Sequence, residues 1–123
     1  MNQEKNYMAD QNHLDLLKKG KDAWNAWRQM EPHIQPDLSK ASLRGLHLEE
    51  IDLDEVNFSE ADLSGAQFTD ASLVRANLSG ANLTLACLRG ADLRDANLSR
   101  ADMRLATLDG ANLTGANLTG IKK

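Results

Sequence analysis

The sequence has few of the residues that usually centre a globular core. Its 123 residues include one cysteine and only five aromatic side chains. One cysteine excludes an internal disulfide, and so few aromatics exclude a core centred on aromatic rings. Leucine and alanine, with 20 and 16 residues, must supply the apolar interior instead. A chain of this length forms one domain at most.

Long apolar runs and an excess of basic residues are also missing. No window approaches the roughly 18 consecutive apolar residues of a membrane-spanning helix. The first residues, MNQEKNYMADQNH, lack the basic and apolar regions of a secretory signal, so we expect a cytoplasmic location. The net charge of −4 gives no electrostatic reason to bind nucleic acid. Neither a membrane nor a nucleic acid is therefore expected as a direct partner.

A repeat of five residues dominates the rest of the chain. Residues 36–120 divide without a gap into seventeen such units, with Leu, Phe or Met at every third position and Ala at thirteen first positions. An α-helix turns about 100° per residue, so it would spread these leucines around its whole surface. A straight strand would point successive leucines to opposite faces, because five is odd. The chain must therefore wind around its own leucines as a solenoid.

The remaining positions of each unit suit the corners of such a solenoid. Asn or Asp fills eleven of the seventeen second positions, and Gly is frequent at the fifth. A spacing of twenty residues aligns like residues in columns, such as Asn57, Asn77, Asn97 and Asn117, a neighbouring column of serines, and Glu55, Arg75 and Asp95. Four units per coil therefore give about four coils. We expect the amide and hydroxyl columns to form hydrogen bonds between stacked coils, and Phe58 to face Phe68 across the second coil.

Runs such as ADLSG, ANLSG, ADLRD and ANLTG closely resemble the pentapeptide-repeat family, over 85 of the 123 residues. The resemblance implies a β fold, a right-handed quadrilateral β-helix with four units per coil. It also implies a bacterial source, because the segment LLKKGKDAWNAWR followed by PDLSKASL is similar to leaders that precede repeats in some bacterial members.

The two ends of the repeat differ in the sequence. Apolar residues at three- and four-residue intervals predict one amphipathic helix over residues 12–31, capped by Asn12, with Trp24 and Trp27 near its inner stripe. This helix is expected to cover the open end of the first coil. We divide the chain into a disordered leader (1–11), a helical cap and connector (12–35), the β-helix (36–120) and a tail (121–123). No comparable lid follows the last coil, which predicts a homodimer through that uncapped coil.

Sites for catalysis, cofactors or metals are not evident in the sequence. His13, His33 and His47 are not at metal-ligand spacing from one another or from Cys87. The serine column lacks a base that could activate a nucleophile, and no partner that would lower the pKa of Cys87 is apparent. We therefore predict a protein that is not an enzyme and that needs no cofactor.

Two surfaces are candidates for binding a protein partner. Leu85 and Leu105 are outward fifth positions twenty residues apart, beside Arg104, and they predict a contact patch of a scaffold module. The alternative for these two leucines is that they are isolated exposed side chains.

The second surface comes from the resemblance, because some family members mimic duplex DNA and bind DNA gyrase. Residues 49–70 carry eight acids and no base, and their acidic patch would imitate phosphates. This patch comprises Glu49, Glu50, Asp52, Asp54, Glu55 and Glu60. The same oxygens could attract a cation, but outward side chains on a rod diverge, so no metal site is predicted.

Overall fold

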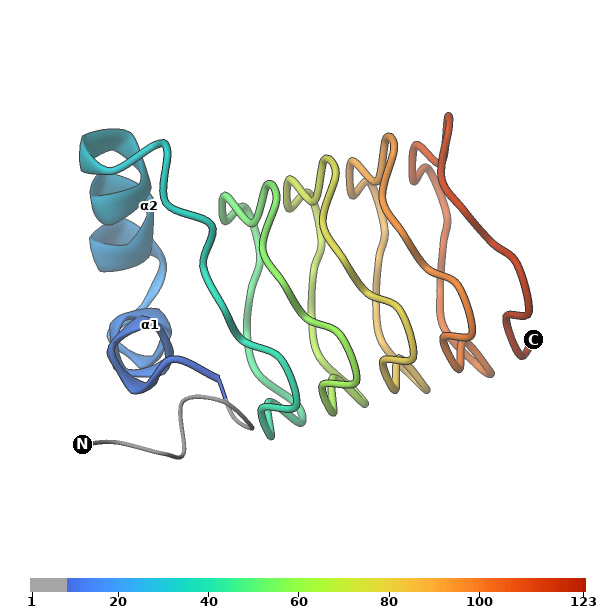
Figure 1. Ribbon diagram of the computed structural model, residues 1–123. Coiled ribbons are helices and arrows are strands. Elements are labelled where there is room, and N and C mark those ends of the chain that lie inside the picture. The colour runs from blue at the N-terminus through green and yellow to red at the C-terminus, as the bar shows by residue number, and fades with distance from the viewer. Residues whose placement is uncertain (1–8) are drawn as a thin grey trace.

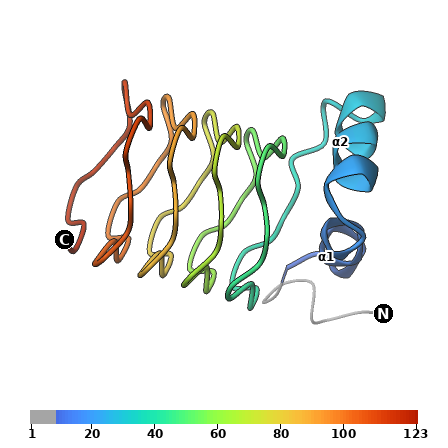
Figure 2. The same cartoon turned by 180° about the vertical axis from the view of Figure 1, so that it is seen from behind.

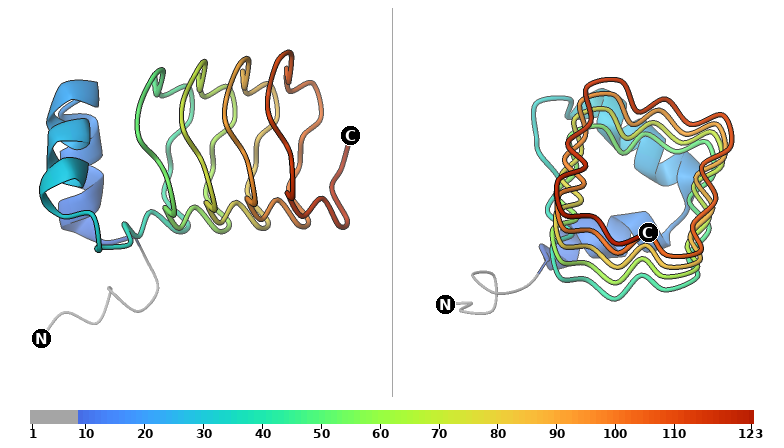
Figure 3. Two further views of the ribbon diagram at one scale, coloured as in Figure 1. Left: turned by 90° about the horizontal axis from the view of Figure 1, so that it is seen from above. Right: turned by 90° about the vertical axis from the view of Figure 1, so that its right-hand side faces the viewer.

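The computed structural model describes residues 9–123, which form a four-sided solenoid with two short helices across its N-terminal end (Figures 1 and 2). The helices are α1 (Gln11–Lys18) and α2 (Lys21–Met30). Viewed along its axis, the solenoid is a square whose coils lie over one another (Figure 3). Residues 1–8 of the predicted leader lie outside the described residues.

Parallel β-bridges join each unit to the unit one coil further on. They link second positions twenty residues apart throughout, from Asp37 with Asn57 to Asp102 with Lys122. This period confirms four units per coil. We number the sides by their first units, so side 1 begins at 36–40, side 2 at 41–45, side 3 at 46–50 and side 4 at 51–55.

Each unit uses its backbone in the same way. On side 1, the N–H of Leu78 donates to the carbonyl of Asn97 (2.7 Å), and the N–H of Gly80 donates to the carbonyl of Ser99 (2.9 Å), both in the next coil. The N–H of Ala81 then donates back to the carbonyl of Leu78 (3.1 Å), which closes a turn at the corner. The fifth residue of every unit has a positive φ, as a type II turn requires.

The Asn and Asp side chains at second positions hold these corners from within the unit. The Asn77 Oδ1 accepts from the backbone N–H of Ser79 (3.0 Å) and from its hydroxyl (2.7 Å). An equivalent bond from the fourth N–H forms in the other units with Asn or Asp at the second position, from Asp37 to Asn117. Among residues 9–123 no amide or serine side chain bonds its counterpart one coil away, so the predicted inter-coil ladders are wrong. The amide oxygen instead accepts from the nearer N–H, that of the fourth residue in its own unit.

The interior is filled by the first and third residues of the units. Apart from Leu46, these residues are buried from Pro36 to Met103. The rings of Phe58 and Phe68 meet edge to face across the second coil, as predicted, with centroids 6.5 Å apart. From Ala106 onward the same positions become partly exposed.

Two helices replace the single predicted one. The chain leaves helical geometry at Gly20, which has φ of 109° and separates α1 from α2. Helix α1 also begins earlier than predicted, because the carboxylate of Asp10 rather than the side chain of Asn12 caps it, accepting from the N–H of Asn12 at 2.9 Å. The break lets both short helices lie across the square end of the coil.

On side 4, residues of α2 take the place of a missing upstream coil. The Trp24 Nε1 donates to the carbonyl of Asp52 (2.6 Å), and the Asn25 Oδ1 accepts from the N–H of Asp52 (2.8 Å). The Arg28 Nη2 donates to the carbonyl of Asp54 (2.6 Å), although Arg28 is only 6% exposed. In every later coil these three groups are bonded by backbone of the preceding coil.

His13 of helix α1 and its N-cap residue Asp10 do the same on side 1. The N–H of Asp37 donates to His13 Nδ1 (3.0 Å), and the N–H of Asp10 donates to the carbonyl of Asp37 (2.9 Å). The imidazole of His13 lies against Trp27, with ring centroids 5.1 Å apart. Within residues 9–123, neither helix has the length and apolarity needed to cross a bilayer.

Candidate functional site

The four corner columns of the solenoid differ in chemistry although they share one backbone geometry. Each column is made of fifth-position residues with positive φ. Three columns carry only charged residues and glycine. The fourth, between sides 2 and 3, is the leucine corner, which consists of Gly45, Gly65, Leu85 and Leu105.

Leu85 and Leu105 occupy this corner against two physical preferences. Their φ angles are 62° and 63°, in the left-handed region that costs an L-residue about 1–2 kcal/mol. Their side chains are 62% and 79% exposed, so burial within the chain does not offset that cost. Gly65, one coil before Leu85, adopts the same geometry without the penalty. The twenty-residue register makes the two leucines neighbours on adjacent coils.

Arg104, the third residue of the predicted contact patch, is already paired. Its Nη2 lies 2.6 Å from the Asp102 Oδ2, and its Nε donates to the Asp102 Oδ1 (2.9 Å). This side-chain bond from Arg104 lowers the pKa of Asp102 to about 2. Arg104 therefore presents a neutralised, fixed guanidinium beside Leu105 rather than a free cation.

Side 3 borders the leucine corner with residues that the sequence analysis did not connect to it. Cys87 lies two residues beyond Leu85, and its sulfur is 3.5 Å from the Thr69 hydroxyl one coil back. That contact, with a smaller contribution from the backbone N–H of Arg89, lowers the pKa of the Cys87 thiol. The expectation that Cys87 has no such partner is wrong, because Thr69 is eighteen residues away in sequence and adjacent only after winding.

The predicted acidic patch is spread over three consecutive sides. Glu49 and Glu50 lie on side 3, the next three acids on side 4, and Glu60 on side 1. The Glu50 carboxylate pairs with Lys21 of α2 (3.1 Å), and the Glu55 carboxylate pairs with Arg75 one coil on (3.0 Å). The acids therefore do not form one continuous face.

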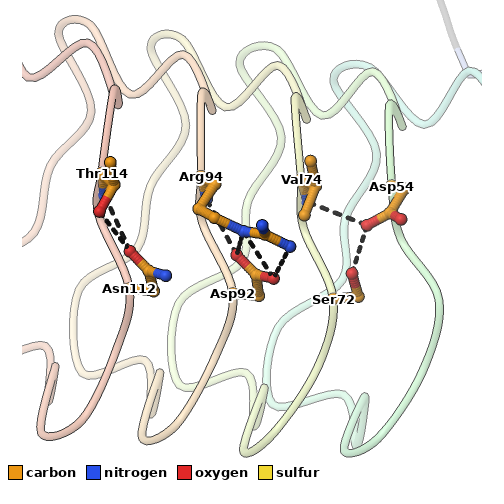
Figure 4. Close-up of polar contacts among 7 residues, drawn as sticks. All are labelled: Asp54, Ser72, Val74, Asp92, Arg94, Asn112 and Thr114. Carbon is orange, nitrogen blue, oxygen red and sulfur yellow. Dashed lines mark hydrogen bonds and ion pairs between the residues drawn. The ribbon is translucent and has the colours of Figure 1, made fainter.

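Asp54 of that patch has a structural task on side 4, shown in Figure 4. In later coils of side 4, the second-position residue bonds the fourth residue of its own unit: the Asn112 Oδ1 accepts from Thr114, and Asp92 binds Arg94. In unit 71–75, the Ser72 side chain does not bond the N–H of Val74. Instead, the Asp54 Oδ1 accepts from the N–H of Val74 (2.9 Å) and from the Ser72 hydroxyl, both in the following coil.

The histidines do not converge into a reactive site in the described part of the chain. His13 is used by the cap, whereas His33 and His47 lie on the surface next to Glu31 and Glu49. No group of three or more His, Cys, Asp or Glu residues between positions 9 and 123 could hold a metal ion. The leucine corner is therefore the surface feature that packing and turn geometry leave unexplained.

Comparison with known proteins identifies a family model that matches the chain. The model for pentapeptide repeats matches eight copies, over residues 37–73, 51–90, 61–100 and 86–122. No curated protein matches the chain.

Solved structures of this family are similar to the chain. They include the pentapeptide repeat protein Rfr23 from the cyanobacterium Cyanothece 51142 (38% identity, 72% of this chain and 61% of that chain, TM-score 0.48). HetL from Nostoc sp. strain PCC 7120, involved in heterocyst differentiation regulation, is 37% identical over 71% of this chain and 46% of its own (TM-score 0.38).

A pentapeptide repeat protein from the Arabidopsis thaliana thylakoid lumen, AT2G44920, is 35% identical over 71% of this chain and 68% of its own (TM-score 0.44). The chain thus spans less than two thirds of the length of Rfr23 and of HetL. The matched repeats cover most of the sequence and coincide with the coils, and the chain therefore belongs to the pentapeptide-repeat family, whose fold is the right-handed β-helix.

Proposed function

We propose that this protein is a non-catalytic scaffold module that binds a protein partner through Leu85 and Leu105, with Arg104 at the rim. The family is generally non-catalytic, which agrees with the expectation of a binding role. The observation that carries the proposal is the pair of exposed leucines in left-handed geometry. Two apolar side chains that cost backbone energy and contact water favour a partner that buries them.

The Arg104–Asp102 pair supports the same surface. An ion pair held in a fixed bidentate geometry can form further hydrogen bonds, with Arg104 donating and Asp102 accepting, without losing rotamer freedom on binding. Apolar anchors with a polar rim are the usual composition of a protein interface.

A pull-down with crosslinking from the native cell, read by mass spectrometry, tests the proposal. The test variant is Leu85→Gly with Leu105→Gly, which removes both side chains and also relieves the turn. The matched control is Lys40→Gly with Arg100→Gly, two exposed fifth positions with φ of 59° and 62° at another corner. We expect one protein to be captured by the wild type and the control and lost from the leucine variant. Equal capture by all three chains would remove the leucine corner from the interface.

The predicted homodimer is a separate proposal. In this chain the third positions of the last units are partly exposed, and Leu118 is 39% exposed. Burial of these side chains against a second copy would stabilise a dimer. Light scattering across a concentration series is expected to show twice the monomer mass at high concentration, and a constant monomer mass would exclude the dimer. The cytoplasmic location and bacterial source stay predictions.

The DNA-mimic alternative would use the acidic patch to bind DNA gyrase. The pairing of Glu50 with Lys21 and of Glu55 with Arg75 weakens it, because these pairs cancel charge that would imitate phosphates. Inhibition of gyrase supercoiling at micromolar protein would favour this alternative over the scaffold, and no inhibition would end it.

A further inference from the structure

Among residues 9–123, the backbone groups that would pair with a preceding coil are bonded at the upstream edge of the first coil on sides 4 and 1 only, and helix α2 touches side 3 just at its last residue, where Asn25 Nδ2 donates to the carbonyl of Glu50 (3.4 Å). Inside the solenoid, three backbone groups of each unit form hydrogen bonds with the preceding coil. They are the N–H and the carbonyl of its second residue and the carbonyl of its fourth residue. The cap replaces most of these bonds on sides 4 and 1. On sides 2 and 3 none of the corresponding groups has a partner among residues 9–123; they are the N–H and carbonyl of Ser42, the carbonyl of Arg44, the N–H and carbonyl of His47, and the carbonyl of Glu49.

Side-chain exposure agrees with an open edge at this place. Ser42 and His47 are exposed, whereas their counterparts one coil on, Asp62 and Gln67, are half-buried. Six backbone groups along two consecutive units, none with a partner in the part of the chain that the structure describes, are a template for one more strand.

We propose that this edge binds an extended peptide segment of a partner protein, which adds a strand parallel to the first coil on sides 2 and 3. The edge shares Gly45 with the leucine corner but includes neither Leu85 nor Leu105, so this proposal does not depend on the proposed function. In the register of the other coils, the N–H groups of the third and fifth residues of a ten-residue segment would donate to the carbonyls of Ser42 and Arg44. The N–H groups of its eighth and tenth residues would donate to the carbonyls of His47 and Glu49. The carbonyls of its first and sixth residues would accept from the N–H groups of Ser42 and His47.

The helical cap selects a single strand over a second copy of this chain. A stacked coil must approach to about 4.8 Å, whereas a helix with its side chains is about 10–12 Å across. Helices α1 and α2 lie across this end of the solenoid (Figure 3), so another solenoid end cannot reach the edge. One extended segment needs contact with the edge alone.

Charge along the edge selects the sequence of that segment. Arg44 on side 2 and Glu49 on side 3 are fourth positions, 74% and 42% exposed in their side chains, and they face outward. A parallel strand would stack its fourth and ninth residues over them. The partner that fits therefore carries an acid first and a base five residues later. Between them a glycine is favoured, because it follows the turn at Gly45, where φ is 66°, without a backbone penalty.

The test measures amide hydrogen exchange of the full chain by NMR with and without excess peptide Ala-Asn-Ala-Glu-Gly-Ala-Asn-Ala-Lys-Gly. In the free protein we expect the Ser42 and His47 amides to exchange much faster than those of Asp62 and Gln67, which donate to Ala41 and Leu46. The peptide should slow exchange at Ser42 and His47 by about tenfold or more. The same peptide N-methylated at its third and eighth residues should protect far less, because it lacks two of the four donors and its methyl groups face the edge.

Three results would overturn the proposal: slow exchange of both amides in the free protein, equal protection by the N-methylated peptide, or no protection by either peptide. Protection that rises with protein concentration alone would assign the edge to a second copy instead. Arg44→Glu should weaken the peptide about twofold to fivefold, and a peptide with its acid and base exchanged should bind more weakly than the original. The Leu85→Gly, Leu105→Gly variant should bind the peptide like the wild type.

Discussion

The two ends of the solenoid differ in how the backbone groups and apolar side chains of the terminal coil are covered. At the N-terminal end, Trp24, Asn25 and Arg28 supply the hydrogen bonds that a preceding coil would make on side 4, and Leu38 and Leu53 beneath the cap are fully buried. At the other end, no segment within residues 9–123 bonds the last coil as the cap bonds the first, and the core positions from Ala106 onward are partly exposed. The difference teaches that this cap replaces backbone partners as well as covering apolar side chains.

The largest difference is expected on removal of a central side chain at each end. Trp24→Ala removes a fully buried ring and leaves the Asp52 carbonyl without its donor, so the free energy of unfolding should fall by about 3–5 kcal/mol. Leu118→Ala, at a side chain 39% exposed, should cost less than about 1 kcal/mol. Urea unfolding followed by circular dichroism measures both. Equal losses would contradict the contrast between the ends.

Arg28→Met tests the backbone substitution itself. The variant keeps the length of the side chain but loses the donors to Ile34 and Asp54, and we expect a loss of about 1–2 kcal/mol in the free energy of unfolding. The matched control is Arg104→Met on the exposed surface of coil 4, for which about 0.5 kcal/mol or less is expected. If both variants lose the same stability, the cap acts only by covering the core.

A smaller effect is expected at the leucine corner, which spans both halves of the rod. Leu105→Gly should raise the free energy of unfolding by about 0.5–1 kcal/mol, because glycine adopts φ of 63° without strain. Gly45→Leu should lower it by a similar amount. A Cβ at Gly45 meets no atom within 4 Å, so only the backbone penalty applies. Thermal or urea unfolding of the two variants provides the measurement, and a destabilised Leu105→Gly chain would show that Leu105 has an unrecognised packing role.

The smallest effect is the response of coil 4 to acid. The pKa of Asp102 is lowered to about 2 by Arg104, so this pair stabilises the fold above the ordinary carboxyl pKa of about 4, and its contribution is lost as the pH falls through 2. Arg104→Ala should flatten the fall in stability between about pH 4 and pH 2. Unfolding midpoints measured across that range are compared with those of Arg44→Ala as the control. The Arg44 Nε lies 3.9 Å from the Asp62 Oδ2, a longer distance than in the Arg104–Asp102 pair, and the Arg44 side chain is more exposed. Identical profiles for the two variants would contradict the assignment.

The parts that the sequence predicted are those set by apolar periodicity. The unit of five residues and the twenty-residue columns follow from which residues must be buried together, and the contact of Phe58 with Phe68 followed from them. The break at Gly20 was missed, because an apolar stripe continues across it and only the square opening requires two short helices. The cap bonds were also missed, since Trp24 and Asp52 are 28 residues apart and a side chain that replaces a backbone donor leaves no periodic signal.

At the leucine corner, the sequence identified the unusual residues but not their cost. That Leu85 and Leu105 are outward neighbours follows from the period, whereas their left-handed backbone becomes visible only with the turn geometry. The pairing of Arg104 with Asp102 could have been noticed, because the second and fourth residues of a unit are adjacent at every corner.

The constant spacing of the β-bridges has a consequence for how such a chain changes length. Every bridge closes a loop of the same twenty residues, wherever it lies in the rod. The insertion or deletion of one whole coil, such as residues 56–75, would keep every corner in its column and leave the helical cap untouched. The length of the rod is thus a matter of copy number, and a duplication within the gene could move two binding surfaces apart by one coil without altering either.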